Sequence, residues 1–232
     1  MPSVFHAREF RRASAPSCAT YSPPLFWGNT WLVNKPLEIE SNSAVAEYFD
    51  LASDNSGVYR MENKEFTKNF VGIMLENIDI PLIFENCVFS SRTFPIHTDV
   101  LGTLVGISLW RCANIQIINC TFSNYQHFGL IFSECINVSV INSTFVSNGN
   151  INMEISGSEN ITVINCEFYQ SRWGVFVDEN QGIVIDACVF KNQEQYGIVV
   201  SYTDQVFLNQ NSFEEIGLEN IKLQNCTNVI NI

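Results

Sequence analysis

Basic residues, and charged residues of any kind, are scarce in this sequence of 232 residues. Lysine and arginine number 12 against 24 acidic residues, the formal charge is −12, and charged residues make up 16% of the chain. Nucleic acids and anionic membrane surfaces select basic faces, so we expect neither as a partner. No apolar run approaches the roughly 18–20 residues that a membrane-spanning helix needs.

Signals for export and for metal binding are also missing. The N-terminal stretch MPSVFHAREFRR lacks an apolar segment, so we find no secretory signal. The 8 cysteines show no CxxC or Cys/His zinc spacing, and no column of aligned acids suits calcium. We therefore predict no metal and no cofactor. Cys112–Cys135 or Cys166–Cys188 could come close enough for a disulfide. We interpret the cysteines instead as reduced thiols, which favours a cytoplasmic or virion-assembled origin.

What the sequence does contain is a repeat. Residues 114–122 read NIQIINCTF, residues 137–145 read NVSVINSTF, and residues 160–168 read NITVINCEF. The closing phenylalanine recurs at intervals of 33, 23, 23, 22 and 23 residues, at Phe89, Phe122, Phe145, Phe168, Phe190 and Phe213. The first interval is longer because SSRTFPIHTDV (90–100) interrupts the series, which predicts an insertion loop there. A fixed period of this length indicates a solenoid.

Apolar and other residues alternate within each unit, which predicts short strands. In the unit that starts at Gly106, Ile107 and Leu109 face one way and Ser108 the other. Three strands of three or four residues cannot bury their apolar faces alone, but copies stacked about 4.8 Å apart enclose a core. Stacking also predicts an asparagine ladder at one bend, formed by Asn119, Asn142 and Asn165.

This pattern resembles the right-handed parallel β-helix superfamily, the pectin-lyase-like fold with short parallel β-helix repeats. The resemblance implies an all-β, single-stranded right-handed parallel β-helix (solenoid) of about eight rungs of 22–23 residues. We assign residues 28–232 to the solenoid, with the insertion near 90–100, and residues 1–27 to an N-terminal cap or tail.

The superfamily includes polysaccharide lyases, glycoside hydrolases, epimerases, phage tailspikes, adhesins and non-catalytic modules, so the fold alone fixes no function. The polygalacturonase-like segments NTD, DD, GHG and RIK, the pectate-lyase-like WxDH and the epimerase DPH are absent. A looser group remains on neighbouring rungs: Glu154, His127, Arg172 and Asp178. These side chains could act as general acid/base and anion clamp, or they could be solvated charges at corners.

Aromatic and apolar residues offer a second candidate site. Strand parity places Ile131, Phe176 and Val199 on the outward side of the first strand, where they could contact sugar rings or a partner chain. Trp173 and Tyr196 immediately precede the Gly position; they could extend this ridge or turn inward and cap the core.

We therefore predict a surface, adhesin-like or tailspike-like module that recognises an extended polymer, which the resemblance implies is a polysaccharide. One alternative is a polysaccharide lyase, hydrolase or epimerase acting on a β-helix face; another is a structural, self-associating protein. Outward positions of the second strand also turn from polar to apolar along the chain, from Gln116, Ser139 and Thr162 to Val184, Phe207 and Ile230. This change predicts self-association or a further domain at the C-terminal end.

Overall fold

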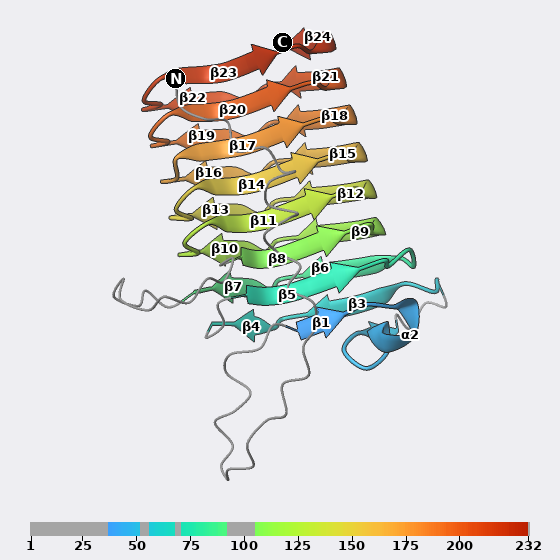
Figure 1. Cartoon of the computed structure of the whole chain (residues 1–232). Coiled ribbons are helices and arrows are strands. Elements are labelled where there is room, and N and C mark those ends of the chain that lie inside the picture. The colour runs from blue at the N-terminus through green and yellow to red at the C-terminus, as the bar shows by residue number, and fades with distance from the viewer. Residues whose placement is uncertain (1–36, 52–55, 68–70, 92–104, 232) are drawn as a thin grey trace, which may run out of the picture. The chain divides into compact units, whose positions relative to one another are not determined.

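The described part of this computed structural model is a parallel right-handed β-solenoid of about seven turns with almost no helix (Figure 1). The predicted fold class is confirmed. The predicted cap at 1–27, and the predicted insertion at 90–100 from residue 92 onward, lie outside the described residues. The structure describes residues 37–51, 56–67, 71–91 and 105–231.

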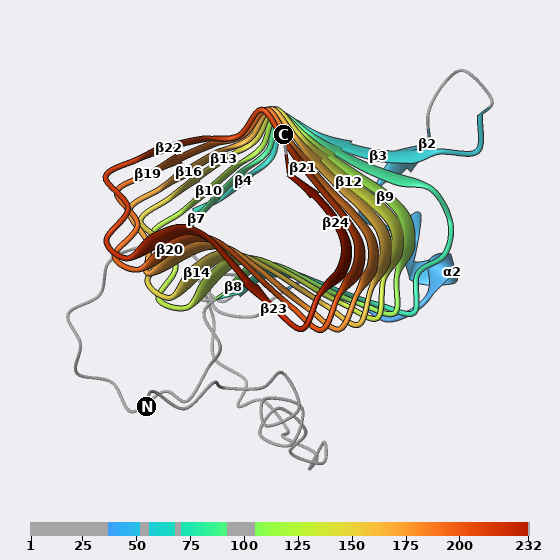
Figure 2. The same ribbon diagram turned by 90° about the horizontal axis from the view of Figure 1, so that it is seen from above.

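Three parallel sheets form the sides of the solenoid, as the view down its axis shows (Figure 2). Sheet A has eight strands: β1 (Leu37–Ile39), β5 (Val71–Glu76), β8 (Val105–Trp110), β11 (Phe128–Ser133), β14 (Ile151–Ser156), β17 (Trp173–Asp178), β20 (Tyr196–Ser201) and β23 (Glu219–Gln224). Sheet B has nine: β2 (Asp50–Leu51), β3 (Tyr59–Glu62), β6 (Leu82–Glu85), β9 (Ala113–Ile118), β12 (Ile136–Ile141), β15 (Glu159–Ile164), β18 (Gln181–Asp186), β21 (Asp204–Asn209) and β24 (Thr227–Asn231). Sheet C has seven: β4 (Glu65–Phe66), β7 (Val88–Ser90), β10 (Thr121–Ser123), β13 (Thr144–Val146), β16 (Glu167–Tyr169), β19 (Val189–Lys191) and β22 (Ser212–Glu214).

Only one described pairing is antiparallel, that of β2 with β3. The short helix α2 (Asn42–Val45) lies near the same N-terminal end of the solenoid (Figure 1). Elsewhere each strand pairs in register with the strand one turn away. The predicted phenylalanine repeat is therefore a column of stacked rings in the core. The centroids of Phe122 and Phe145 are 4.8 Å apart, with 6° between the ring planes.

Asparagine has two roles at the corners. The predicted ladder residues Asn119, Asn142 and Asn165 adopt left-handed backbone conformations, with φ of 52°, 50° and 52°. Asparagine tolerates this conformation better than most residues do, which explains its recurrence there. Amide-to-amide hydrogen bonds between successive turns lie in a different column: Asn137 donates to Asn114 (3.3 Å) and Asn160 donates to Asn137 (3.4 Å).

Gly174 marks an irregularity that positions the outward face of sheet A. A Cβ atom there would lie 2.5 Å from the carbonyl oxygen of Gly197 and 2.6 Å from Cδ1 of Phe190, so this position points into the core. Val175, the next residue, is also in the core. Two consecutive inward positions break the alternation, and as a result Trp173 and Phe176 lie on the same outward side.

Apolar side chains are exposed in the last described turn. Leu223 in β23 is 46% exposed and Ile230 in β24 is 50% exposed. Self-association or a further domain at this end stays a prediction.

Candidate functional site

The outward face of sheet A brings together most of the predicted site residues. The central outward positions of successive strands stand in register: Ile131 pairs with Glu154, Glu154 with Phe176, and Phe176 with Val199. Val199 pairs in turn with Lys222. The column therefore combines apolar side chains with one acid and one base on a rigid ladder.

A second apolar cluster, separate from the main core, occupies this face. Its buried members are Val105, Phe128, Ile151, Phe176 and Val199, and packed against them are Ile131, Trp173 and Tyr196. All of the predicted binding residues belong to this cluster. Phe176 and Val199 are only 4% and 7% exposed, however, whereas parity alone predicted that they face solvent. They are covered in part because the residues that begin each strand pack over the same face.

Trp173 and Tyr196 are the half-buried aromatic edge of this cluster. The Trp173 ring lies 5.3 Å from that of Phe176 and 5.9 Å from that of Tyr196, nearly perpendicular to the latter at 70°. Trp173 Nε1 donates to Gln195 Oε1 (3.0 Å), and Lys222 Nζ donates to the Tyr196 hydroxyl (3.1 Å). Flat rings with polar groups at their edges are suited to amphipathic ligands.

Glu154 and Asp178 form an acidic pair beside this cluster. Asp178 lies two residues beyond Phe176 in β17, opposite Ser156 of β14. Burial, and secondarily the charge of Asp178, raises the pKa of Glu154 to about 7. Asp178 is 6% exposed, and its Oδ1 accepts a 2.6 Å hydrogen bond from Ser201 Oγ. Near neutral pH the Glu154 carboxyl is therefore partly protonated.

The structure places His127 and Arg172 away from this pair. Each immediately precedes a strand of sheet A, four residues before the outward position in line with Glu154. At roughly 3.3 Å per residue this is a separation of about 13 Å along the strands. His127 Nδ1 contacts Asn150 Nδ2 (2.9 Å), and burial lowers the pKa of His127. The Arg172 guanidinium lies 5.8 Å from the centroid of the Trp173 ring. The four predicted catalytic residues thus occupy two ends of the face.

Sequence reasoning missed the polar partners of these residues. Ser201 and Gln195 follow no motif, and Lys222 is a single basic residue in the column that contains Glu154. Ser201 follows Asp178 by 23 residues and Gln195 follows Trp173 by 22, which is one repeat in each case. The period of the repeat was therefore the signal that could have found Ser201 and Gln195.

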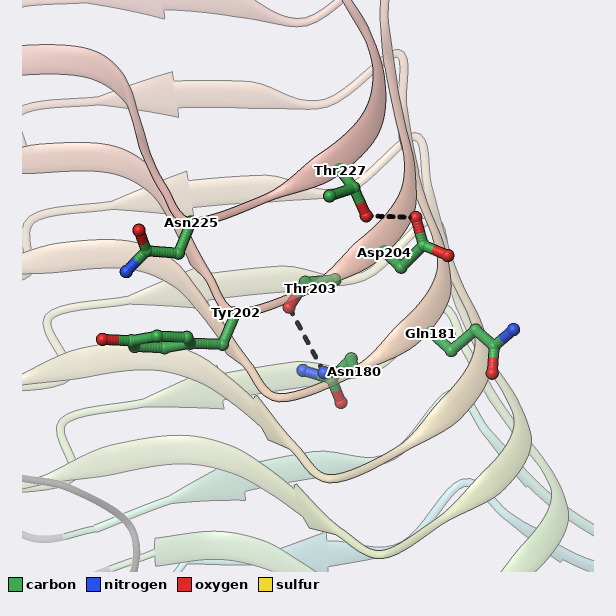
Figure 3. Close-up of a pocket in the computed structure, with 7 residues that line it drawn as sticks. All are labelled: Asn180, Gln181, Tyr202, Thr203, Asp204, Asn225 and Thr227. Atoms are coloured by element: carbon green, nitrogen blue, oxygen red, sulfur yellow. Dashed lines mark hydrogen bonds between the residues drawn. The ribbon is translucent and has the colours of Figure 1, made fainter.

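A separate hollow lies where sheet A turns into sheet B, near the C-terminal turns (Figure 3). Its volume is about 360 Å³, and it is lined by Asn180, Gln181, Tyr202, Thr203, Asp204, Asn225 and Thr227. None of these residues was predicted as a site residue.

Two family models match this chain. The model of the family described as "Right handed beta helix region" matches residues 105–232, and that of "Periplasmic copper-binding protein (NosD)" matches residues 29–168. The chain belongs to both families. No curated protein matches this β-helix protein. In the described part of the chain, no helix is long and apolar enough to cross a membrane.

The described residues do not fit the copper named in the second family's description. Within 37–51, 56–67, 71–91 and 105–231, no group of three or more His, Cys, Asp or Glu side chains could hold a metal ion. The interior cysteines are free thiols that donate to main-chain carbonyls, as Cys87 Sγ does to Met61 O at 3.4 Å. We therefore assign no copper site to the described residues.

The predicted cytoplasmic or virion-assembled origin is wrong, because the NosD family is described as periplasmic. The inference failed because it treated reduced cysteines as a sign of compartment. Cys87 and Cys188 are 0% exposed, so burial in the core shields these thiols from reaction in any compartment.

Solved structures share the fold at low sequence identity. The periplasmic alginate epimerase AlgG superposes with a TM-score of 0.58 at 12% identity, over 75% of this chain and 50% of that one. Tailspike protein 2 from an Escherichia coli O157:H7 bacteriophage gives 0.57 at 12%, over 80% and 27%. The GH136 lacto-N-biosidase from Eubacterium ramulus gives 0.57 at 11%, over 84% and 50%. This chain thus spans half or less of each of these proteins.

Proposed function

We propose that this β-helix protein binds an extended polysaccharide along the outward face of sheet A. The observation that carries the proposal is the aromatic edge of Trp173 and Tyr196, held on in-register strands beside Phe176. Strands one turn apart are spaced by about 4.8 Å, so the face offers repeated, evenly spaced contacts to a chain lying along the solenoid axis.

The chemistry of this edge suits sugar rings. A pyranose presents an apolar face and a rim of hydroxyl groups, which an aromatic ring flanked by hydrogen-bonding groups can match. Gln195 supplies such a group at the Trp173 indole N–H, and Lys222 supplies one at the Tyr196 hydroxyl, with its Nζ 4.7 Å from the centroid of that ring. The acidic balance of the chain, −12, argues for a polymer of low charge density, because a polyanion would be repelled at long range.

Proteins that share the fold support a carbohydrate partner. They include an alginate epimerase and a lacto-N-biosidase, whose names refer to sugars, and a phage tailspike. Identities of 11–12% carry the fold only, so this support is an analogy and the aromatic edge remains the main argument.

A second function, acid/base chemistry on a bound polysaccharide, is favoured by one observation. Glu154, whose pKa burial and then Asp178 raise to about 7, can both give and accept a proton near neutral pH. Asp178, whose Oδ1 accepts a hydrogen bond from Ser201, would be the second carboxyl group of the site. In this alternative Glu154 acts as general acid or base and Asp178 as its electrostatic partner.

Affinity electrophoresis through gels containing neutral or acidic polysaccharides tests both functions, with a parallel assay for new reducing or unsaturated ends. The binding proposal predicts retardation by at least one polymer without new ends, and loss of that retardation in Trp173→Ala. New ends that disappear in Glu154→Gln, while retardation persists, would establish the catalytic alternative. No retardation in any gel together with no new ends would contradict both.

A further inference from the structure

The hollow between sheets A and B is formed by two columns of side chains (Figure 3). Tyr202 and Asn225 occupy the same corner position in successive turns. On the sheet B side, Asp204 pairs in register with Gln181 below it and Thr227 above it. Asn180 and Thr203, which are 6% and 2% exposed, lie between the columns and close the floor.

Tyr202 is unusual for its position. Its φ is 46°, a left-handed conformation that a bulky side chain adopts at a cost. In the other described turns the same left-handed corner holds no aromatic residue, but Asn77, Arg111, Glu134, Gly157, Glu179 and Asn225. The Tyr202 side chain is nonetheless 51% exposed, so packing does not account for the aromatic ring.

The ring stands on a rigid support. The backbone N–H of Tyr202 donates to Gln224 O (3.0 Å), and the next residue, Thr203, donates through Oγ1 to Ser201 O (2.7 Å). Below it, Asn180 Nδ2 donates to the carbonyls of Ile155 (2.9 Å) and Asp178 (2.8 Å). The backbone that carries the ring is fixed in this way, so only the Tyr202 side chain has to be ordered when a ligand binds.

The polar groups of the lining restrict the class of ligand. Gln181 and Asn225 each carry an amide, which offers both donors and an acceptor. Asp204 Oδ1 accepts from Thr227 Oγ1 (2.5 Å) and Asn228 Nδ2 (2.7 Å), and these hydrogen bonds lower the pKa of Asp204, so the carboxylate is ionised at neutral pH. Among the described residues, no Lys, Arg or His lines the hollow. An anionic ligand would meet a carboxylate and no counter-charge.

We propose that this hollow is a binding site for a single uncharged sugar unit, with the Tyr202 ring as its stacking platform. Hydroxyl groups of the sugar donate to the Asp204 carboxylate and exchange hydrogen bonds with the amides of Asn225 and Gln181. The volume of about 360 Å³ is at the small end of ligand sites, which suits one sugar ring and not a long chain. This site goes beyond the polymer-binding face and does not depend on it.

Saturation-transfer NMR tests the site with glucose, galactose, mannose and N-acetylglucosamine at millimolar concentration, and with glucuronate as the anionic comparison. We expect saturation transfer to at least one of the neutral sugars and a weaker signal for glucuronate. Tyr202→Ala should weaken binding of that sugar about three- to tenfold, the loss of one aromatic contact. Asp204→Asn should also weaken it.

Tyr48→Ala is the matched control, because Tyr48 is a 44% exposed tyrosine near the first turns of the solenoid; its variant should bind as wild type does. The comparison is repeated in the Trp173→Ala background, which removes the aromatic contact of the sheet A face, so a further loss of signal on adding Tyr202→Ala is assigned to the hollow. No transfer to any neutral sugar, tighter binding of glucuronate, or unchanged binding in a folded Tyr202→Ala variant would each overturn the proposal.

Discussion

Ser201 Oγ donates a 2.6 Å hydrogen bond to Asp178 Oδ1 on the outward face of sheet A. The charge of Asp178 in turn contributes to the raised pKa of Glu154. Ser201 and Asp178 come from neighbouring turns, one repeat apart, and pair directly in the backbone ladder. Solenoid register thus produces an ordered acidic pair from residues that no local motif connects.

The pair predicts a measurable coupling. Burial is the larger cause of the raised pKa of Glu154 and the Asp178 charge is the smaller one. Asp178→Asn should therefore lower the pKa of Glu154 from about 7 but leave it above the ordinary value for glutamate. Titration of the Glu154 carboxyl by ¹³C NMR measures this shift. Asp186→Asn, which removes a carboxylate on sheet B that accepts from Asn209 Nδ2 (2.9 Å), should leave it unchanged.

The same carboxyl predicts how stability depends on pH. Burial and the charge of Asp178 raise the pKa of folded Glu154 to about 7, above the roughly 4.3 of an unfolded glutamate. Between these values the unfolded chain has already released a proton that the folded chain retains, so this group's contribution to stability falls as pH rises and levels off above about pH 7. Glu154→Gln should remove this loss of stability with rising pH.

Urea unfolding at about pH 4 and about pH 8 measures the effect. Relative to wild type, Glu154→Gln should gain up to about 3 kcal/mol between the two conditions, and less if water reaches the carboxyl. A variant whose stability follows that of wild type at both pH values would show that Glu154 is an ordinary solvated acid.

The phenylalanine column should dominate the stability of the core. Phe145 is 0% exposed and stacks on Phe122 at 4.8 Å and on Phe168 at 5.0 Å. Phe145→Ala leaves a cavity between two turns and should cost about 3–5 kcal/mol of unfolding free energy. Phe207→Ala, at a half-buried outward position of sheet B, should cost much less. Chemical denaturation of both variants gives the comparison, and equal losses would contradict the assignment of the core.

Thiol reactivity checks the placement of the cysteines. Cys120 and Cys166 are 1% and 0% exposed, whereas Cys226 is half-buried in the last turns. In the native protein, Cys226→Ser should remove one rapidly reacting equivalent towards Ellman's reagent, and Cys166→Ser should remove none until denaturant is added. Loss of a rapid equivalent in Cys166→Ser would place that thiol at the surface.

Much of the fold could be predicted because a strict period repeats the same physical constraint. Each Phe of the 22–23-residue repeat stacks on the next, and each corner needs a left-handed residue, so columns such as Asn119, Asn142 and Asn165 appear in the sequence. The amide ladder was assigned to the wrong column, because both asparagine columns adopt positive φ. Only the three-dimensional structure shows that Asn114 and Asn137 bond each other and that the ladder lies in their column.

The site was harder to predict because it depends on where the alternation breaks. Parity placed Phe176 outward correctly, but it left open the direction of Trp173, which the consecutive inward positions Gly174 and Val175 decide. Grouping by rung placed His127 and Glu154 on neighbouring turns, but it did not give the offset of four residues along the strand that separates them. The Tyr202 hollow carries no motif at all; its one sequence signal is an aromatic residue in a corner column that otherwise lacks one.

The central claim, that the outward face of sheet A binds a polysaccharide, is tested most directly by one dissociation constant. Isothermal titration measures the dissociation constant of Trp173→Ala for the polymer that retards the wild-type protein most strongly. Phe207→Ala is the aromatic control on sheet B. We predict that affinity falls about tenfold in Trp173→Ala and is unchanged in Phe207→Ala. Equal affinity of a folded Trp173→Ala variant and wild type would contradict the account.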